Sequence, residues 1–145
     1  MKIALITDTH FGARNDNLAF NEYFYKFWEN TFFPYLDEHK IDTIIHLGDL
    51  MDRRKFVSYK IAKDLRERFI LPIVSRGIKM HVMAGNHDTY YKNTNEINYL
   101  YELLGGPGEE KYSVLNVMMA HVPKSLMEQG FTLCRGFVLI TTSVL

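Results

Sequence analysis

Three short apolar segments alternate with two longer amphipathic segments in the first part of the chain. The apolar segments are KIALIT (residues 2–7), TIIHLG (43–48) and IKMHVMAG (78–85). They are rich in β-branched residues and lack strict alternation of apolar and polar positions, which is typical of parallel strands covered on both faces. The segments between them carry apolar residues at helical spacing. The pattern therefore predicts an α/β fold with βαβαβ order and a mostly parallel sheet flanked by helices.

Residues 18–40 form the first predicted helix, with Asp16 and Asn17 as candidate N-caps. Pro34 is expected to kink or end this helix, because proline has no N–H to donate. The second predicted helix covers residues 58–77, with Ser58 as its N-cap, Pro72 as a late break and Gly77 as its C-terminal stop. A third helix is expected at roughly residues 95–104, before the Gly-Gly-Pro at residues 105–107.

Composition limits the classes of protein that fit. At 145 residues and 47% hydrophobic content, the chain is long and apolar enough for one domain with a real core. Seventeen basic and seventeen acidic residues give no net charge, so a polyanion would have to be bound locally. Cys134 is the single cysteine, which suits a reducing compartment. With no signal peptide or membrane segment recognised, we expect a soluble, cytoplasmic protein.

Each predicted strand ends in a polar cluster. The clusters are Asp8-Thr9-His10, Gly48-Asp49-Leu50-Met51-Asp52 and Gly85-Asn86-His87-Asp88. One such cluster alone is usually a turn or a helix cap. Because the carboxyl ends of parallel strands meet at one edge of a sheet, we expect the three clusters to converge on one crevice.

The side chains in these clusters suit divalent metals. Asp8 and Asp49 offer anionic oxygens, His10 an imidazole and Asn86 a neutral carbonyl oxygen, a mixture that favours Mn²⁺, Fe²⁺ or Zn²⁺. Two metals about 3.5–4 Å apart need a shared carboxylate, and Asp49, on the central strand end, is best placed to bridge them. Such a metal pair could hold a hydroxide that attacks the phosphorus of a phosphate ester. His87 is then left to face that phosphate and to protonate or orient its leaving oxygen.

The three clusters resemble the D-x-H, G-D-x-x-D and G-N-H-[DE] signature of the calcineurin-like metallophosphoesterases. The resemblance implies the N-terminal βαβαβ half of a metallophosphoesterase sandwich. It implies that Asp8 and His10 bind one metal, that Asp49 bridges, that Asn86 binds the other metal and that His87 is catalytic. Two divalent ions are implied, with Mn²⁺ favoured and Fe²⁺, Zn²⁺ or Mg²⁺ as alternatives.

Within that superfamily, G-D-L-M-D-R-R-K and the later Y-Y-K look most like SbcD-type DNA repair nucleases, including phage recombination endonuclease subunits. This resemblance implies a DNA substrate, an SbcC-type ATPase partner, a role in recombination or repair and a homodimer. Asp52 and Asp88 would orient ligands and neighbouring basic groups without binding metal.

A basic and aromatic stretch follows two of the clusters. Its candidate phosphate or DNA contacts are Arg53, Arg54, Lys55, Tyr91 and Lys92. For Arg53, Arg54 and Lys55, a solvated surface explains the basic run equally well. For Tyr91 and Lys92, the alternative is packing against the third helix. His46 and His81 lie within predicted strands and are interpreted as core histidines, or as histidines that support the ligands, and not as ligands themselves.

The resemblance covers residues 1 to about 105, so we divide the chain into residues 1–110, the N-terminal part of the domain, and an atypical tail at residues 111–145. The family's later G-H and G-H-x-H motifs are not found, and His121 matches neither. One hypothesis is that the tail is a frame-shifted reading. In the shifted frame the codons of residues 118–120 must encode Asp-Gly. A tail of this origin should pack poorly on the sheet.

Three functions remain open from the sequence. The first is a metal-dependent DNA endonuclease or exonuclease subunit that hydrolyses phosphodiester bonds with two metals. The second is a small-molecule or protein phosphoesterase of the same superfamily. The third is an inactive metal-binding fragment, because the C-terminal histidine motifs are absent from this chain.

Overall fold

The computed structural model describes residues 2–94, 96–105, 115–118 and 142–143. Within these ranges the strands form one sheet in the order β4-β3-β2-β1-β5. The parallel strands are β1 (Lys2–Ile6), β2 (Thr43–His46), β3 (Lys79–Met83) and β4 (Leu115–Met118). The short β5 (Thr142–Ser143) pairs antiparallel with β1. The predicted βαβαβ order and parallel sheet are confirmed.

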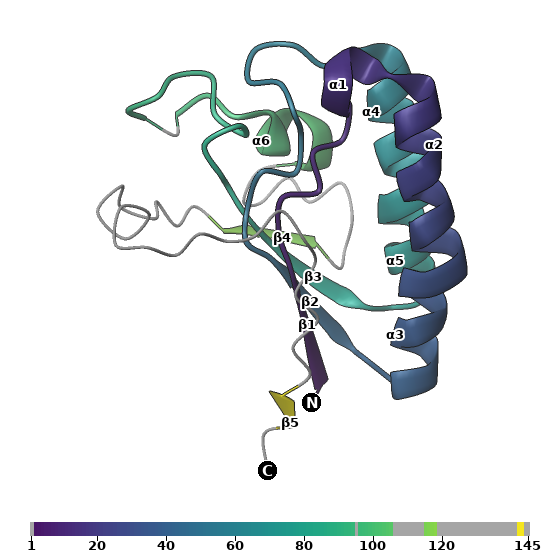
Figure 1. Ribbon diagram of the computed structural model, residues 1–145. Coiled ribbons are helices and arrows are strands. Elements are labelled where there is room, and N and C mark those ends of the chain that lie inside the picture. Colours follow the sequence, from purple (N-terminus) through teal and green to yellow (C-terminus); the bar gives the residue numbers. More distant parts are fainter. Residues whose placement is uncertain (1, 95, 106–114, 119–141, 144–145) are drawn as a thin grey trace, which may run out of the picture.

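Two long helical segments cover one face of the sheet (Figure 1). The first consists of α2 (Leu18–Phe27), η1 (Trp28–Phe32) and α3 (Phe33–His39), and the second of α4 (Tyr59–Leu65), η2 (Arg66–Ile70) and α5 (Leu71–Ser75). The Asn17 side chain caps α2 by accepting the Phe20 N–H at 2.9 Å. Ser58 caps α4 in the same way. Asp16 was the wrong cap candidate: it lies in the preceding turn, α1 (Ala13–Asp16).

Neither proline ends its helix, contrary to the sequence prediction. Pro34 and Pro72 each lie in the first turn of an α-helical segment that directly follows a π-helical segment. In the π segments the bonds reach one residue further back, as when the Phe33 N–H donates to the carbonyl of Trp28. The wider turn accommodates the missing proline N–H, so both helices continue. Gly77 follows the last helical turn with φ of 66°, as predicted for a helix stop.

The third helix is shorter than expected. It is α6 (Tyr99–Leu104), and Asn98 caps it by accepting the Tyr101 N–H at 3.1 Å. The residues before Asn98 are held outside the helix because Thr89 forms an isolated bridge with Asn98. The helix ends at Gly105, which has φ of 93°.

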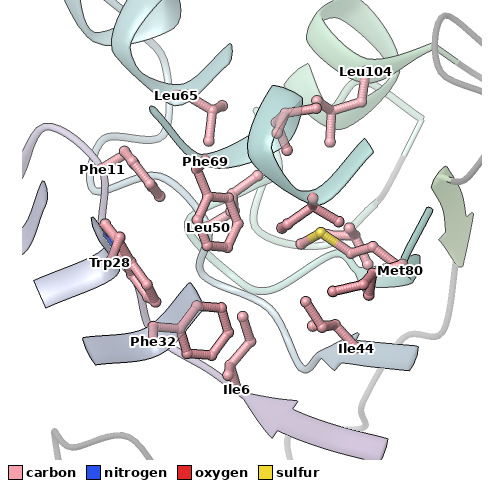
Figure 2. Close-up of a cluster of buried hydrophobic side chains, with 14 of the residues drawn as sticks. Ile6, Phe11, Trp28, Phe32, Ile44, Leu50, Leu65, Phe69, Met80 and Leu104 are labelled. Atoms are coloured by element: carbon pink, nitrogen blue, oxygen red, sulfur yellow. The ribbon is translucent and has the colours of Figure 1, made fainter. Parts of the chain in front are cut away.

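The core lies between the sheet and the two long helical segments. Figure 2 shows Trp28, Phe32 and Phe69 from the helices facing Ile6 of β1 and Ile44 of β2, and all five side chains are buried. The ring centres of Trp28 and Phe69 lie 4.8 Å apart. This packing fixes the helices on the sheet, so the carboxyl ends of the strands are held in a constant arrangement.

Only parts of the atypical tail fall among the described residues. The backbone of β4 pairs with β3 over residues 115–118, and β5 pairs with β1. The poor packing expected of the tail stays a prediction. His121 and Cys134 lie outside the described residues. Within the described part of the chain, no helix has the length and apolar character needed to cross a membrane.

Candidate metal centre

The loops after β1 and β2 run side by side beyond the ends of their strands. The Asp8 N–H donates to the Gly48 carbonyl at 3.1 Å, and the His10 N–H donates to the Asp49 carbonyl at 3.1 Å. The Phe11 N–H continues this series by donating to Leu50 at 2.9 Å. These bonds hold the first two polar clusters together, as the strand-end argument predicted.

A close backbone contact brings in the third cluster. A Cβ built on Gly85 would lie 2.2 Å from the Asp49 nitrogen and 2.3 Å from the Asp49 Oδ1. A Cβ on Gly48 would lie 2.7 Å from the Gly85 Cα. Both positions must be glycine for the loops to approach this closely. The contact places the G-N-H-D cluster directly against Asp49.

The backbone is strained at three of the candidate metal ligands. Asp8, His10 and Asp49 have φ values of 54°, 44° and 55°. Left-handed dihedrals at residues other than glycine cost about 1–3 kcal/mol each and collect at functional sites. The hydrogen bonds between the loops hold these dihedrals. The strained backbone lowers the stability of the fold and directs the three side chains toward one another.

Asp8, His10 and Asp49 each place one potential ligand atom within 4.8 Å of the other two. His10 Nε2 lies 3.4 Å from Asp8 Oδ1. His10 Nδ1 is buried without a hydrogen bond, although a carboxylate oxygen of Asp52 lies 3.5 Å away. Among the described residues, no lysine or arginine pairs with Asp8 or Asp49. Two carboxylates without a basic partner, with the His10 Nε2 beside one of them, fit a divalent cation.

Asn86 completes the group of candidate ligands. Its side-chain amide lies 3.1 Å and 3.3 Å from the two carboxylate oxygens of Asp49. With the nitrogen turned inward the amide donates to Asp49. With the oxygen turned inward it adds a third oxygen to the same point, an arrangement that a cation stabilises.

The orientation of His87 is fixed by two contacts. Its backbone N–H donates to Asp49 Oδ1 at 2.8 Å, and its ring Nδ1 contacts the backbone carbonyl of Asp52. Because a carbonyl only accepts, the proton lies on Nδ1 and leaves Nε2 for another partner. The ring meets that of His10 edge to face, with centres 5.1 Å apart. The sequence did not reveal that Asp52 would act through its backbone.

Asp88 joins the loop after β2 to the loop after β3. It is fully buried and accepts from the backbone N–H groups of Gly85 at 2.8 Å and of Leu50 and Met51 at 3.3 Å. Burial raises the pKa of its carboxyl, opposed mainly by the hydrogen bond from Tyr99. The Tyr99 hydroxyl contacts Asp88 and also accepts the Met51 N–H at 3.0 Å. The sequence contains no motif that could have identified Tyr99.

A second buried network joins the first two loops. The Nε2 of His46 lies 3.0 Å from the Thr9 hydroxyl, which donates to the Leu50 carbonyl at 3.1 Å. The Nδ1 of His46 accepts the Gly48 N–H at 3.2 Å. The interpretation of His46 as a core histidine is confirmed. Hydrophobic patterning predicted its burial but not these partners.

The predicted phosphate or DNA contacts follow Asp52 and Asp88 in the sequence, and some of them already contact other residues of the protein. These candidates are Arg53, Arg54, Lys55, Tyr91 and Lys92. Arg53 is paired with Asp16 and donates to the Asn15 side chain at 3.0 Å. The side chains of Arg54, Lys55, Tyr91 and Lys92 are half-buried or exposed. Lys55 lies over the Tyr90 ring and Tyr91 meets that ring edge to face, so Arg53 is the predicted contact residue whose charge is already paired with a carboxylate.

Comparison with known proteins agrees with this geometry. A family model described as calcineurin-like phosphoesterase matches residues 1–137. The chain belongs to the calcineurin-like phosphoesterase family. The match runs past residue 105, where the recognisable motifs end, so the family's pattern extends further along this phosphoesterase than its motifs indicated.

This calcineurin-like phosphoesterase is also similar to a named phage protein. It is 37% identical over 70 residues to "Exonuclease subunit 1" of Enterobacteria phage T4. The matched segment makes up 48% of this chain and 20% of the phage protein. The chain thus matches about a fifth of that relative's length.

Proposed function

We propose that this phosphoesterase is a nuclease subunit that hydrolyses phosphodiester bonds of DNA in recombination or repair. One observation carries the proposal: Asp8, His10 and Asp49 place ligand atoms within 4.8 Å of one another, and the His87 backbone donates to Asp49. Similarity to a phage protein named as an exonuclease subunit supports DNA as the substrate class.

In this proposal Asp8 and His10 would hold one divalent cation, Asn86 would hold a second, and Asp49 would serve both. When bound, two such cations, with Mn²⁺ favoured and Fe²⁺, Zn²⁺ or Mg²⁺ as alternatives, would supply charge neutralisation at a phosphate and a lower pKa for a coordinated water. The protein contributes rigid placement. Backbone hydrogen bonds between the loops and the buried Asp88 carboxylate keep Asp49 in its left-handed conformation.

His87 is the proposed proton donor to the leaving oxygen. Its Nδ1 is committed to the Asp52 carbonyl, so only Nε2 is left to face a substrate. The His87 backbone N–H also holds Asp49 Oδ1, which couples the position of the ring to the bridging carboxylate. Asp52 therefore orients the histidine and takes no part in binding a cation.

The partners follow from the resemblance alone. We propose an SbcC-type ATPase subunit, a homodimer and action in the cytoplasm of the host. The word "subunit" in the name of the phage relative supports the expectation of an assembly.

The first test is Asp49→Ala in the purified protein, with Glu38→Ala, an exposed acidic residue on α3, as the matched control. We expect Mn²⁺-dependent DNA cleavage by the wild type and the control. Cleavage should be lost in Asp49→Ala while circular dichroism stays unchanged. Cleavage that survives in a folded Asp49→Ala protein contradicts the assignment.

Two chromogenic substrates separate the remaining functions. A nuclease should cleave bis(4-nitrophenyl) phosphate, a diester, faster than 4-nitrophenyl phosphate, a monoester. Faster cleavage of the monoester, with DNA left intact, would indicate a small-molecule or protein phosphoesterase. Calorimetric Mn²⁺ binding without turnover of any substrate would identify an inactive metal-binding fragment.

His87→Ala tests the role of the histidine. Because its ring is proposed to act on the leaving group, turnover should fall about 10²–10⁴-fold while Mn²⁺ binding measured by calorimetry is largely kept. Loss of Mn²⁺ binding together with activity would instead make His87 a ligand.

A further inference from the structure

A cleft of about 260 Å³ opens between the loop at residues 54–57 and the segment at residues 90–103. Its apolar lining includes Phe56, Tyr90 and Ile97. These three side chains are 57%, 38% and 49% exposed, which is high for large apolar groups that line a hollow. The cleft thus presents flat aromatic and aliphatic surface to an incoming group.

The cleft shares a wall with the metal centre. Tyr99 lines it, and the Tyr99 hydroxyl contacts Asp88 and accepts the Met51 N–H at 3.0 Å. Met51 follows Asp49 by two residues. The loop on the other side of the cleft begins directly after Asp52, whose carbonyl holds the His87 ring. The cleft and the metal centre are thus connected through Tyr99 and through the chain that runs from Asp52 into Arg54.

The mouth of the cleft is basic. Arg54 and Lys55 both line it, against one acidic side chain, Glu102. Arg54 forms no ion pair within the described part of the chain. The Lys55 ammonium lies 4.6 Å from the ring centre of Tyr90 and has no carboxylate partner among the described residues. Positive charge is therefore available beside the aromatic surface.

Arg53 contacts Phe56 at the rim of the cleft. Arg53 is paired with Asp16 and lies over the Phe56 ring, 4.8 Å from its centre. These contacts hold Phe56 at the surface without placing it in the core. Phe56 remains 57% exposed although the Arg53 guanidinium lies over its ring.

We propose that this cleft binds one unstacked base of a DNA strand whose phosphodiester lies at the metal centre. The aromatic and aliphatic walls stack on the base, and Arg54 and Lys55 bind its phosphates. An anionic group attached to a flat apolar ring is the chemistry that this combination recognises. The inference rests on the proposed nuclease function and adds a preference for single-stranded or frayed DNA over an intact duplex.

The test is a binding measurement that needs no cleavage. Fluorescence anisotropy compares a single-stranded oligonucleotide, the same strand with abasic sites and a blunt duplex, without divalent metal and at fixed salt. Removing the bases keeps the phosphate charge, so the abasic strand should bind about tenfold more weakly. The duplex should also bind more weakly than the intact strand, because its bases are already stacked.

Two aromatic variants locate the binding surface. Phe56→Ala and Tyr90→Ala should each weaken binding of the intact strand about tenfold and leave binding of the abasic strand unchanged. Tyr23→Ala is the matched control, because Tyr23 is 72% exposed on α2 and does not line the cleft. It should leave every affinity unchanged. Circular dichroism checks that each variant is folded.

A charge variant tests the second half of the site. Lys55→Gln should weaken binding of intact and abasic strands equally and reduce the slope of log affinity against log salt by about 0.7. Equal affinity for intact and abasic strands overturns the proposal, as does a loss in Tyr23→Ala that matches the loss in Tyr90→Ala. Base-dependent binding without DNA cleavage would contradict the proposed function and leave the cleft assignment standing. DNA cleavage with base-independent binding would do the reverse.

Discussion

His46 should make the stability of this protein depend on pH. The ring is fully buried and its two nitrogens are both engaged. Because the Gly48 N–H donates to Nδ1, the proton lies on Nε2 and is donated to the Thr9 hydroxyl. A second proton on Nδ1 would face the Gly48 N–H and break this contact. The fold therefore requires the neutral ring.

The size of the effect follows from the pKa. Burial, with a smaller contribution from the charge of His10, lowers the pKa of His46 from 6.5 to about 3. As pH falls below 6.5, His46 becomes protonated in the unfolded chain but stays neutral in the folded chain. The free energy of unfolding therefore decreases until the pH reaches about 3. The maximal slope is about 1.4 kcal/mol per pH unit, which gives a loss of about 2 kcal/mol between roughly pH 6.5 and pH 5.

Urea denaturation from pH 7.5 to pH 5 measures this loss in the wild type and in His46→Gln. Other titrating groups act in both proteins, so the difference between the two curves isolates His46. That difference should change by about 2 kcal/mol over the lower part of the range. Thr31→Ala, at an exposed position of η1 with no titratable group, is the control and should keep the wild-type slope.

Parallel curves for the wild type and His46→Gln would refute the reasoning. If His46→Gln does not fold, NMR of the wild-type protein provides an independent measurement. The His46 ring should remain neutral, with its proton on Nε2, down to pH 5. A ring that takes up a proton above pH 5 in the folded protein would show that burial does not control its titration.

Three further predictions concern the metal centre and the tail. Gly85→Ala forces a Cβ to within 2.3 Å of Asp49 Oδ1, so stability should fall by about 1–3 kcal/mol in thermal unfolding and Mn²⁺ binding should be lost in calorimetry. Gly77→Ala is the control and carries only the cost of a positive φ, because nothing lies within 4 Å of its added Cβ. Wild-type Mn²⁺ binding in Gly85→Ala would contradict the argument that Gly85 must lie close to Asp49. Asp88→Asn turns an amide toward backbone donors, so the melting temperature and Mn²⁺ affinity should both fall; an unchanged melting temperature would show that the carboxylate does not hold the loops. Resequencing of the locus should reveal a second open frame that crosses the codons of residues 111–145 and continues downstream to encode the G-H and G-H-x-H motifs. A stop codon soon after the shift point would exclude the frame-shift hypothesis.

Local sequence was sufficient for the order of elements and for two helix starts. Apolar runs and turn residues act over a few neighbours, so β1, β2 and β3 were predicted within a few residues of their observed bounds. The Asn17 and Ser58 caps bond to backbone groups three residues away and were recognisable for the same reason. Local rules failed at Pro34 and Pro72, because a proline penalty assumes a regular α-helix and the π-helical segments change that geometry.

The residues of the candidate site were visible in the sequence, but their working geometry was not. Strand ends that meet at one sheet edge predicted that Asp8, His10 and Asp49 would converge, and these residues do lie together. Their left-handed dihedrals depend on bonds between loops about 40 residues apart in sequence, as between His10 and Asp49. The same holds for the Asp52 carbonyl on His87 and the Tyr99 hydroxyl on Met51. Sequence chemistry chose the side chains, and only the packed sheet and loops decided which atoms face one another.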